Sequence, residues 1–163
     1  PKHIISDGDG WAYLNLNELE KKVVETELSR PMNVAWYRNQ SRNLNASLSI
    51  PYYLNGEWEN MYPDFLFFQQ TGNGSIVRTI VDPHGDWLGD SVAKLKGYVA
   101  YLRDHPDLFG SVLAVAEDRD KTCRYLDLTL PSVQNAIDIF TGSSAKELFH
   151  GPLSQVYAVR QDR

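Results

Sequence analysis

Asp64 and Asp82 are the two residues whose type and spacing could do chemistry. Between them lie two apolar runs, residues 65–70 and 76–81, separated by a turn rich in glycine that is centred on Asn73. Turns of this composition join antiparallel strands. If Asn73 lies at the tip of the hairpin, Asp64 and Asp82 face each other across it, with Cβ atoms about 4.5–5.5 Å apart.

Two carboxylates held this close among apolar residues repel each other unless they share a proton or a cation. Mg²⁺ or Mn²⁺ suits such a pair, because a hard divalent cation uses one or two carboxylates and keeps several waters. The alternative is that both aspartates are ordinary strand-end residues in solvent, since each adjoins a proline, as turn residues often do. The spacing alone leaves both interpretations open.

Apolar periodicity predicts the elements that must position this pair. Helices are expected over residues 16–28, 90–104, 131–140 and 145–149. Strands are expected over residues 33–39, 48–53, 65–70, 76–81, 111–116, 124–130 and 156–159, and the first ten residues are expected to be a loose lead-in. The order of helix, strand meander, helix, two strands and helix predicts an α/β fold, with a mixed central β-sheet flanked by helices on both faces.

Length and composition limit the class of protein. The 163 residues are expected to form a single domain, and with 42% hydrophobic and 23% charged residues they are not a disordered or collagen-like chain. No apolar run approaches the roughly 18 residues that a membrane span needs. The single cysteine, Cys123, excludes an internal disulfide framework and a zinc site made of cysteines alone. A net charge of −5 excludes a broadly basic nucleic-acid coat but not a local basic patch.

Several short motifs follow one another along residues 14–140. They are a glutamate-rich predicted helix, then Trp36-Tyr37-Arg38-Asn39, Ile50-Pro51-Tyr52, Pro63-Asp64-Phe65, Asp82-Pro83-His84-Gly85 and Lys94-Leu95-Lys96-Gly97. In this order they resemble the restriction-endonuclease-like fold called PD-(D/E)xK. The resemblance is greatest to the C-terminal nuclease-like domain of bacterial helicases related to the restriction subunit of type III restriction enzymes. Because the chain begins with Pro1, we expect it to be the C-terminal part of such a larger chain.

The resemblance implies a Mg²⁺- or Mn²⁺-dependent DNA endonuclease. Asp64 matches the first metal-binding acid of the fold and Asp82 the second. The fold also takes a glutamate from a helix, and Glu20 matches it, with Glu27 as the runner-up. The other interpretation of Glu20 is the third position of a helix capping box behind Asn17.

His84 stands where the fold has a lysine, two residues after the second acid. A histidine can orient or deprotonate water, because its ordinary pKa lies near 6.5, but it lacks the permanent charge of lysine. Pro83 lacks a backbone N–H and could turn His84 away. Lys94, one helical turn after Asp90, is the other candidate for the lysine. If neither residue serves, the site is inactive.

The resemblance also implies a set of partners. DNA would be contacted by arginine, amide and lysine side chains, for which the candidates are Arg38, Asn39, Arg42 and Lys96; the alternative is a solvated loop and a charged helix face. The helicase portion of the same parent chain and a methyltransferase subunit would be protein partners, in the cytoplasm. Two rival functions remain: a non-catalytic nuclease-fold module that binds DNA or docks onto the helicase, and an unrelated α/β interaction domain.

Overall fold

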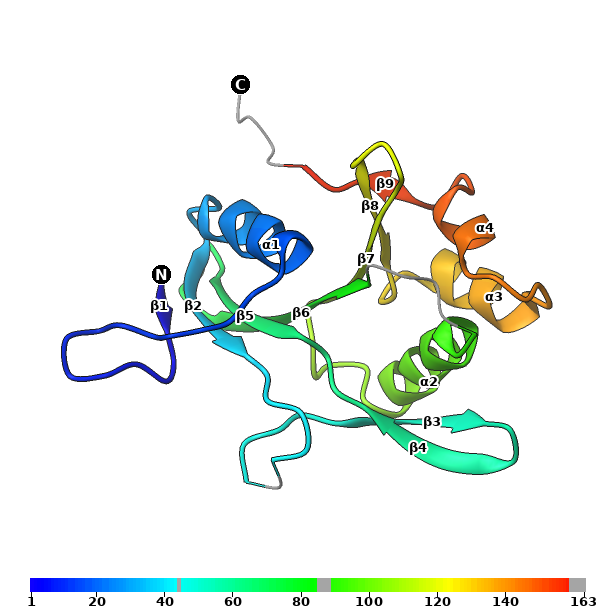
Figure 1. Cartoon of the computed structure of the whole chain (residues 1–163), viewed down its shortest axis with the longest axis horizontal. Helices are drawn as coiled ribbons and strands as arrows, with labels where there is room; N and C mark the ends of the chain where they lie inside the picture. The colour runs from blue at the N-terminus through cyan, green and yellow to red at the C-terminus, as the bar shows by residue number, and fades with distance from the viewer. Residues whose placement is uncertain (44, 85–88, 159–163) are drawn as a thin grey trace.

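The chain folds around a mixed sheet in the computed structural model, which describes residues 1–43, 45–84 and 89–158 (Figure 1). Its strands are β1 (Lys2–His3), β2 (Asn33–Arg38), β5 (Phe65–Gln70), β6 (Ile76–His84), β7 (Ser111–Glu117), β8 (Cys123–Asp127) and β9 (Gln155–Val156), neighbours in that order. A separate hairpin consists of β3 (Ile50–Leu54) and β4 (Glu57–Met61). The helices are α1 (Glu18–Leu28), α2 (Ser91–Asp104), α3 (Pro131–Ile139) and α4 (Lys146–Phe149).

The pairing of the strands explains the role of α2. Strands β2, β5 and β6 form an antiparallel meander, whereas β6 and β7 are parallel. Two parallel neighbours need a long crossover between them, and α2 lies in that connection. The predicted α/β fold with a mixed sheet is therefore confirmed.

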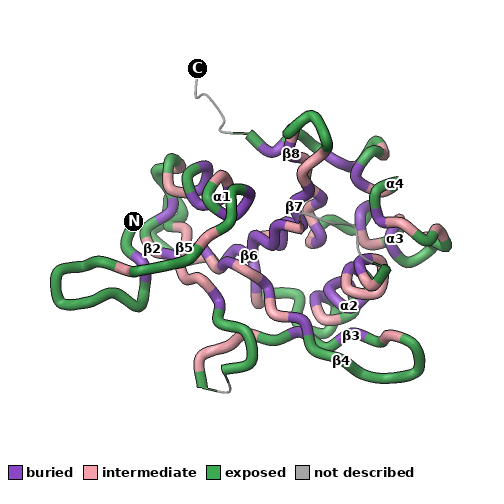
Figure 2. The backbone as a smooth tube through the Cα atoms, viewed as in Figure 1, coloured by how far each residue is buried: buried purple, intermediate pink, exposed green. Residues whose placement is uncertain are grey.

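Hydrophobic layers cover the sheet on both faces. Alternate residues of the central strands contribute to different layers: Ile80 and Val112 pack with α2 and α3, whereas Val81 and Leu113 pack with α1. Helices α1 and α2 accordingly lie on opposite sides of the sheet in Figure 1, and Figure 2 shows β6 and β7 buried between them. Strands covered on both faces carry continuous apolar runs, as these do.

The register of the β5–β6 hairpin is the one predicted. Phe65 pairs with Val81 and Gln70 with Ile76, so the hairpin is symmetric about Asn73. The pairing brings the residues just beyond Phe65 and Val81, which are the two aspartates, to the same end of the sheet.

Three predictions about the strands need correction. The strand expected over residues 48–53 is not in the main sheet, because β3 pairs with β4. Strand β4 was not predicted, since its residues are mostly exposed and include two charged side chains. The lead-in contains β1, which pairs with β2. Strand β6 continues through Pro83 to His84. The last predicted strand is described only as Gln155–Val156, and residue 159, like Gly85 of the fourth quoted motif, lies outside the described residues.

The β3–β4 hairpin rests on α2 (Figure 1). The contact is closest at Gly97, where an added Cβ would lie 2.5 Å from the Cβ of Tyr52. A glycine at this position is what lets the helix approach the hairpin so closely. Among the helices of the described ranges, none has the length and apolarity that a membrane span requires.

Candidate functional site

The two aspartates meet at one end of the β5–β6 pair. Asp64 immediately precedes β5, and its backbone N–H donates to Oδ1 of Asp82, near the end of β6, over 2.9 Å. Burial and, after it, the negative charge of Asp82 raise the pKa of the Asp64 carboxyl. The hairpin symmetry therefore predicted the neighbourhood of these residues.

Asp82 is buried and fully hydrogen-bonded. Its Oδ2 accepts from the Tyr98 hydroxyl over 2.8 Å and lies 2.9 Å from Nε2 of His84, while Oδ1 accepts from the Asp64 backbone. Burial favours the neutral acid, but the His84 charge and these hydrogen bonds outweigh it and hold the pKa of Asp82 below its ordinary value. Asp82 is thus the ionised member of the pair.

Asp64 is the member that binds a proton more readily. Burial, followed by the charge of Asp82, raises the pKa of Asp64 from 3.8 to about 7. Arg38 opposes this rise through an ion pair in which Nη1 lies 2.8 Å from Oδ1 of Asp64. The pair therefore keeps one proton up to nearly neutral pH. When Asp64 loses that proton, Arg38 neutralises its negative charge only in part.

Glu20 reaches the site through Arg38. Nη2 of Arg38 lies 2.6 Å from Oε1 of Glu20, and the guanidinium carbon stands 5.1 Å from the centre of the Phe65 ring. The other oxygen of Glu20 accepts from the Asn17 backbone over 2.8 Å, and Oδ1 of Asn17 accepts from the Glu20 backbone over 2.9 Å. The capping box is confirmed, and the same glutamate also faces the aspartates.

His84 stays beside Asp82 because β6 continues in register through Pro83. Burial disfavours its charged form, but the Asp82 carboxylate outweighs burial and raises the pKa of His84 above 6.5. Lys94 forms an ion pair with Asp90 over 2.7 Å and is near enough for its charge to oppose that rise. Both candidates for the missing lysine therefore lie on the α2 side of the acid pair.

Other predicted residues lie elsewhere. Glu27 is fully buried and faces away from the aspartates: it accepts from the Tyr157 hydroxyl over 2.7 Å and from Nδ2 of Asn33 over 3.1 Å. It is an internal polar contact, so the runner-up glutamate is not brought to the site.

Of the predicted DNA-contacting side chains, that of Arg38 contacts the acid pair, and those of the other three lie elsewhere. The Asn39 amide is buried. Its Nδ2 donates to the Leu48 carbonyl and its Oδ1 accepts from the Leu48 N–H, so neither atom is accessible to a ligand. Arg42 is exposed in the following loop. Lys96 is exposed on α2, and its Nζ donates to the Phe140 carbonyl over 3.0 Å.

Tyr98 is the site residue that sequence reasoning missed. Its side chain is almost completely buried, and burial together with the charge of Asp82 raises the pKa of Tyr98 well above 10, so its hydroxyl keeps its proton and donates a hydrogen bond. The available signal was spacing: Tyr98 follows Lys94 by four positions and therefore shares its face of α2. A tyrosine on a buried helix face needs a partner for its hydroxyl.

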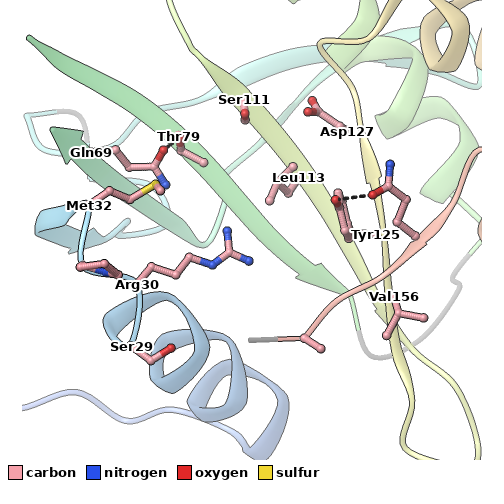
Figure 3. A pocket seen from close by; sticks show the side chains of 13 residues that line it. Ser29, Arg30, Met32, Gln69, Thr79, Ser111, Leu113, Tyr125, Asp127 and Val156 are labelled. Carbon is pink, nitrogen blue, oxygen red and sulfur yellow. Dashed lines mark hydrogen bonds between the residues drawn. The ribbon is translucent and has the colours of Figure 1, made fainter. Parts of the chain in front are cut away.

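A cavity of about 420 Å³ occupies the other end of the sheet (Figure 3). Arg30 projects toward it from the turn after α1, and Thr79, Ser111 and Asp127 lie on the strands beneath. None of the predicted site residues lines this cavity. It is thus distinct from the acid cluster.

The donor set fits a hard cation held by two carboxylates. The charges of Arg38 and His84 do not outweigh the burial of Asp64 and the charge of Asp82, so ionised Asp64 lacks a full counter-charge. Mg²⁺ can use two carboxylates and complete its shell with water. In residues 1–43, 45–84 and 89–158, no three His, Cys, Asp or Glu side chains are arranged to hold one ion together. Glu20 has one oxygen on the Asn17 backbone and the other on Arg38, so it could join a metal ion only by giving up one of these contacts.

Comparisons with known proteins place the chain in a family. Residues 1–158 match the model of the YagJ family. Protein YagJ of Escherichia coli (strain K12) is 36% identical over 155 residues, which cover 95% of this chain and 62% of the relative, so the chain spans only part of that protein's length. No solved structure matches the chain significantly. The chain belongs to the YagJ family.

Proposed function

We propose that this chain is the nuclease-like domain of a Mg²⁺- or Mn²⁺-dependent DNA endonuclease, which hydrolyses phosphodiester bonds. One observation carries the proposal: Asp64 and Asp82 share one end of a hairpin, and burial together with the charge of Asp82 raises the pKa of Asp64 to about 7. A bound cation would stabilise the ionised form of both carboxylates. Perturbed carboxyls in a polar cluster are also typical of functional sites.

The arrangement of elements supports the finer PD-(D/E)xK assignment. Helix α1 supplies Glu20, and the β5–β6 hairpin supplies both acids, as the resemblance implies. His84 occupies the lysine position and touches the second acid. The proposed fold thus rests on four matched positions and the mixed sheet that holds them.

Asp64 and Asp82 would hold the metal ion. When bound, Mg²⁺ or Mn²⁺ supplies the acidity that makes water a nucleophile and neutralises charge on the phosphate. Tyr98 and the backbone N–H of Asp64 fix the orientation of Asp82. His84, whose pKa is raised, carries positive charge over a wider pH range than an ordinary histidine and can perform part of the role of lysine at the phosphate.

A second function, a non-catalytic DNA-binding or docking module attached to a helicase, is favoured by one observation. Arg38 pairs with both Glu20 and Asp64, so most of the acidic charge has a partner inside the protein. A fold that has lost catalysis could keep the cluster for stability. Such a module need not bind Mn²⁺, and this separates the two functions.

The test is cleavage of supercoiled plasmid DNA in the presence of Mn²⁺ or Mg²⁺. We expect nicked or linear product, and we expect Asp64→Asn and Asp82→Asn to lose this activity. Asp107→Asn, which changes an exposed aspartate between α2 and β7, is the matched control and should cut normally. Equal cleavage by all four proteins would show that the acid pair is not the site. Mn²⁺ binding without cleavage would favour the non-catalytic module.

A further inference from the structure

Arg38 joins two carboxylates that come from different parts of the chain. Its Nη2 is 2.6 Å from Oε1 of Glu20 on α1, and its Nη1 is 2.8 Å from Oδ1 of Asp64 before β5. The same Nη1 donates to the backbone carbonyls of Asn39 and Asp64 over 3.1 and 3.3 Å. One guanidinium therefore supplies the counter-charge that keeps these acids together.

This guanidinium lies in a position from which it can leave. The Arg38 side chain keeps 24% of its surface exposed, and that of Asp64 keeps 25%. The guanidinium carbon lies 5.1 Å from the centre of the Phe65 ring, and its polar contacts leave the side chain partly open to solvent. The contacts with solvent mean that a competing cation can reach Asp64 and that Arg38 can reach an anion outside.

A metal ion and Arg38 would compete for the Asp64 carboxylate. When all three acids are ionised, Glu20, Asp64 and Asp82 face two cationic groups, Arg38 and His84, and one negative charge remains without a counter-charge. A divalent ion on the carboxylates adds two positive charges, and the cluster then repels the guanidinium. A phosphate of the DNA backbone is the partner that an arginine with this planar fork suits best.

We propose that Arg38 is a displaceable counter-cation. It holds Glu20 and Asp64 while no metal ion is bound, and a metal ion that takes the Asp64 carboxylate frees the guanidinium to bind the DNA backbone. This inference rests on the proposed function, because it assumes that the acids bind metal. Binding of metal and binding of the phosphodiester then strengthen each other. A bound metal ion frees Arg38 to bind a phosphate, and a bound phosphate draws Arg38 away from the carboxylate that the metal ion needs.

The first test measures Mn²⁺ binding at pH 8, using electron paramagnetic resonance to detect the free ion. Arg38→Gln removes the competing charge, so we expect Mn²⁺ to bind roughly tenfold more tightly, the equivalent of about 1.4 kcal/mol. Arg38→Lys keeps the charge but cannot bridge two carboxylates as a fork, and should show a smaller increase in affinity. Arg42→Gln, four residues away and exposed, is the matched control and should bind like the parent.

The second test is the coupling between the two ligands. A phosphorothioate DNA duplex that resists cleavage should tighten Mn²⁺ binding to the parent protein several-fold, and this gain should disappear in Arg38→Gln. Circular dichroism melting checks that each variant is folded. If Arg38→Gln does not fold, Arg38→Lys carries the test.

The outcomes separate the two ideas. Tighter Mn²⁺ binding by the Arg38 variants, with loss of the coupling to DNA, supports the inference. Unchanged or weaker Mn²⁺ binding by these variants, beside a parent that binds Mn²⁺, overturns the inference and leaves the proposed function standing. If neither the parent nor any variant binds Mn²⁺, both are wrong.

Discussion

Replacing Asp64 with asparagine should stabilise the metal-free protein at alkaline pH. Asparagine keeps the shape and the polarity of the protonated aspartic acid but cannot ionise. The variant therefore mimics the protonated form of Asp64, which the fold favours because burial and Asp82 both oppose the charge. Near pH 4 the parent already carries the proton, and the two proteins should differ little.

The sign and the size follow from the pKa. The folded-state pKa of Asp64 is about 7 against an ordinary value of 3.8, so the folded chain binds this proton more tightly than the unfolded chain. Stability from Asp64 is then fully present below about pH 4 and is lost as the pH rises to about 7. A difference of roughly three pH units, at about 1.4 kcal/mol each, sets an upper limit of about 4 kcal/mol. Because the proton is shared with Asp82, we expect a measured gain of about 2–4 kcal/mol.

Urea denaturation in EDTA, at intervals from pH 4 to pH 8, measures this difference directly. The free energy of unfolding of Asp64→Asn minus that of the parent should grow over this range and level off near pH 8. Asp107→Asn should show no such growth. A difference that is the same at every pH, or a loss of stability at pH 8, would refute the account of Asp64 as a carboxyl that burial and Asp82 force to keep its proton.

Three further predictions concern residues around the acid pair. Tyr98→Phe leaves Oδ2 of Asp82 without its buried hydroxyl donor and should cost about 1–3 kcal/mol in urea denaturation; a neutral effect would mean that this hydrogen bond is not needed. Gly97→Ala puts a methyl group against Tyr52 and should lower the free energy of unfolding by about 1–3 kcal/mol, whereas an unchanged melting temperature would contradict the close approach. If His84 acts through its charge, we expect the rate of the parent to decline once the pH passes the raised pKa of His84. His84→Lys should then cleave DNA without that decline, while His84→Ala should be inactive. An inactive His84→Lys would instead indicate that a neutral imidazole is required.

The acid pair was predictable because two independent signals agreed on the hairpin. A turn rich in glycine marked its centre, and the apolar runs on either side gave strands of matching length, so the register that brings Asp64 and Asp82 to one end of the hairpin was predictable. The capping box at Glu20 was equally local and equally predictable.

What escaped prediction depends on contacts distant in sequence. Glu20 and Glu27 look alike on the stripe of α1, and only the fold shows that Glu27 meets Tyr157, 130 positions away, while Glu20 meets Arg38. Strand β4 was hidden because exposed, charged residues gave it no apolar alternation. Strand β4 is held by its pairing with β3, which packs on α2, and neither contact can be recognised from the sequence of β4 alone.

The polar chain that runs from Glu20 through Arg38 and Asp64 to Asp82 and Tyr98 has a consequence for the order of folding. Its ends belong to α1 and α2, which pack on opposite faces of the sheet. The β5–β6 hairpin is local and can form early, but α2 docks only when the parallel β6–β7 pairing closes, and contacts of that kind form slowly. We therefore expect the acid cluster to be completed last: a chain that has folded only the α1 layer has Arg38 beside Asp64 and His84 beside Asp82, but it lacks the Tyr98 hydroxyl and the burial that α2 provides.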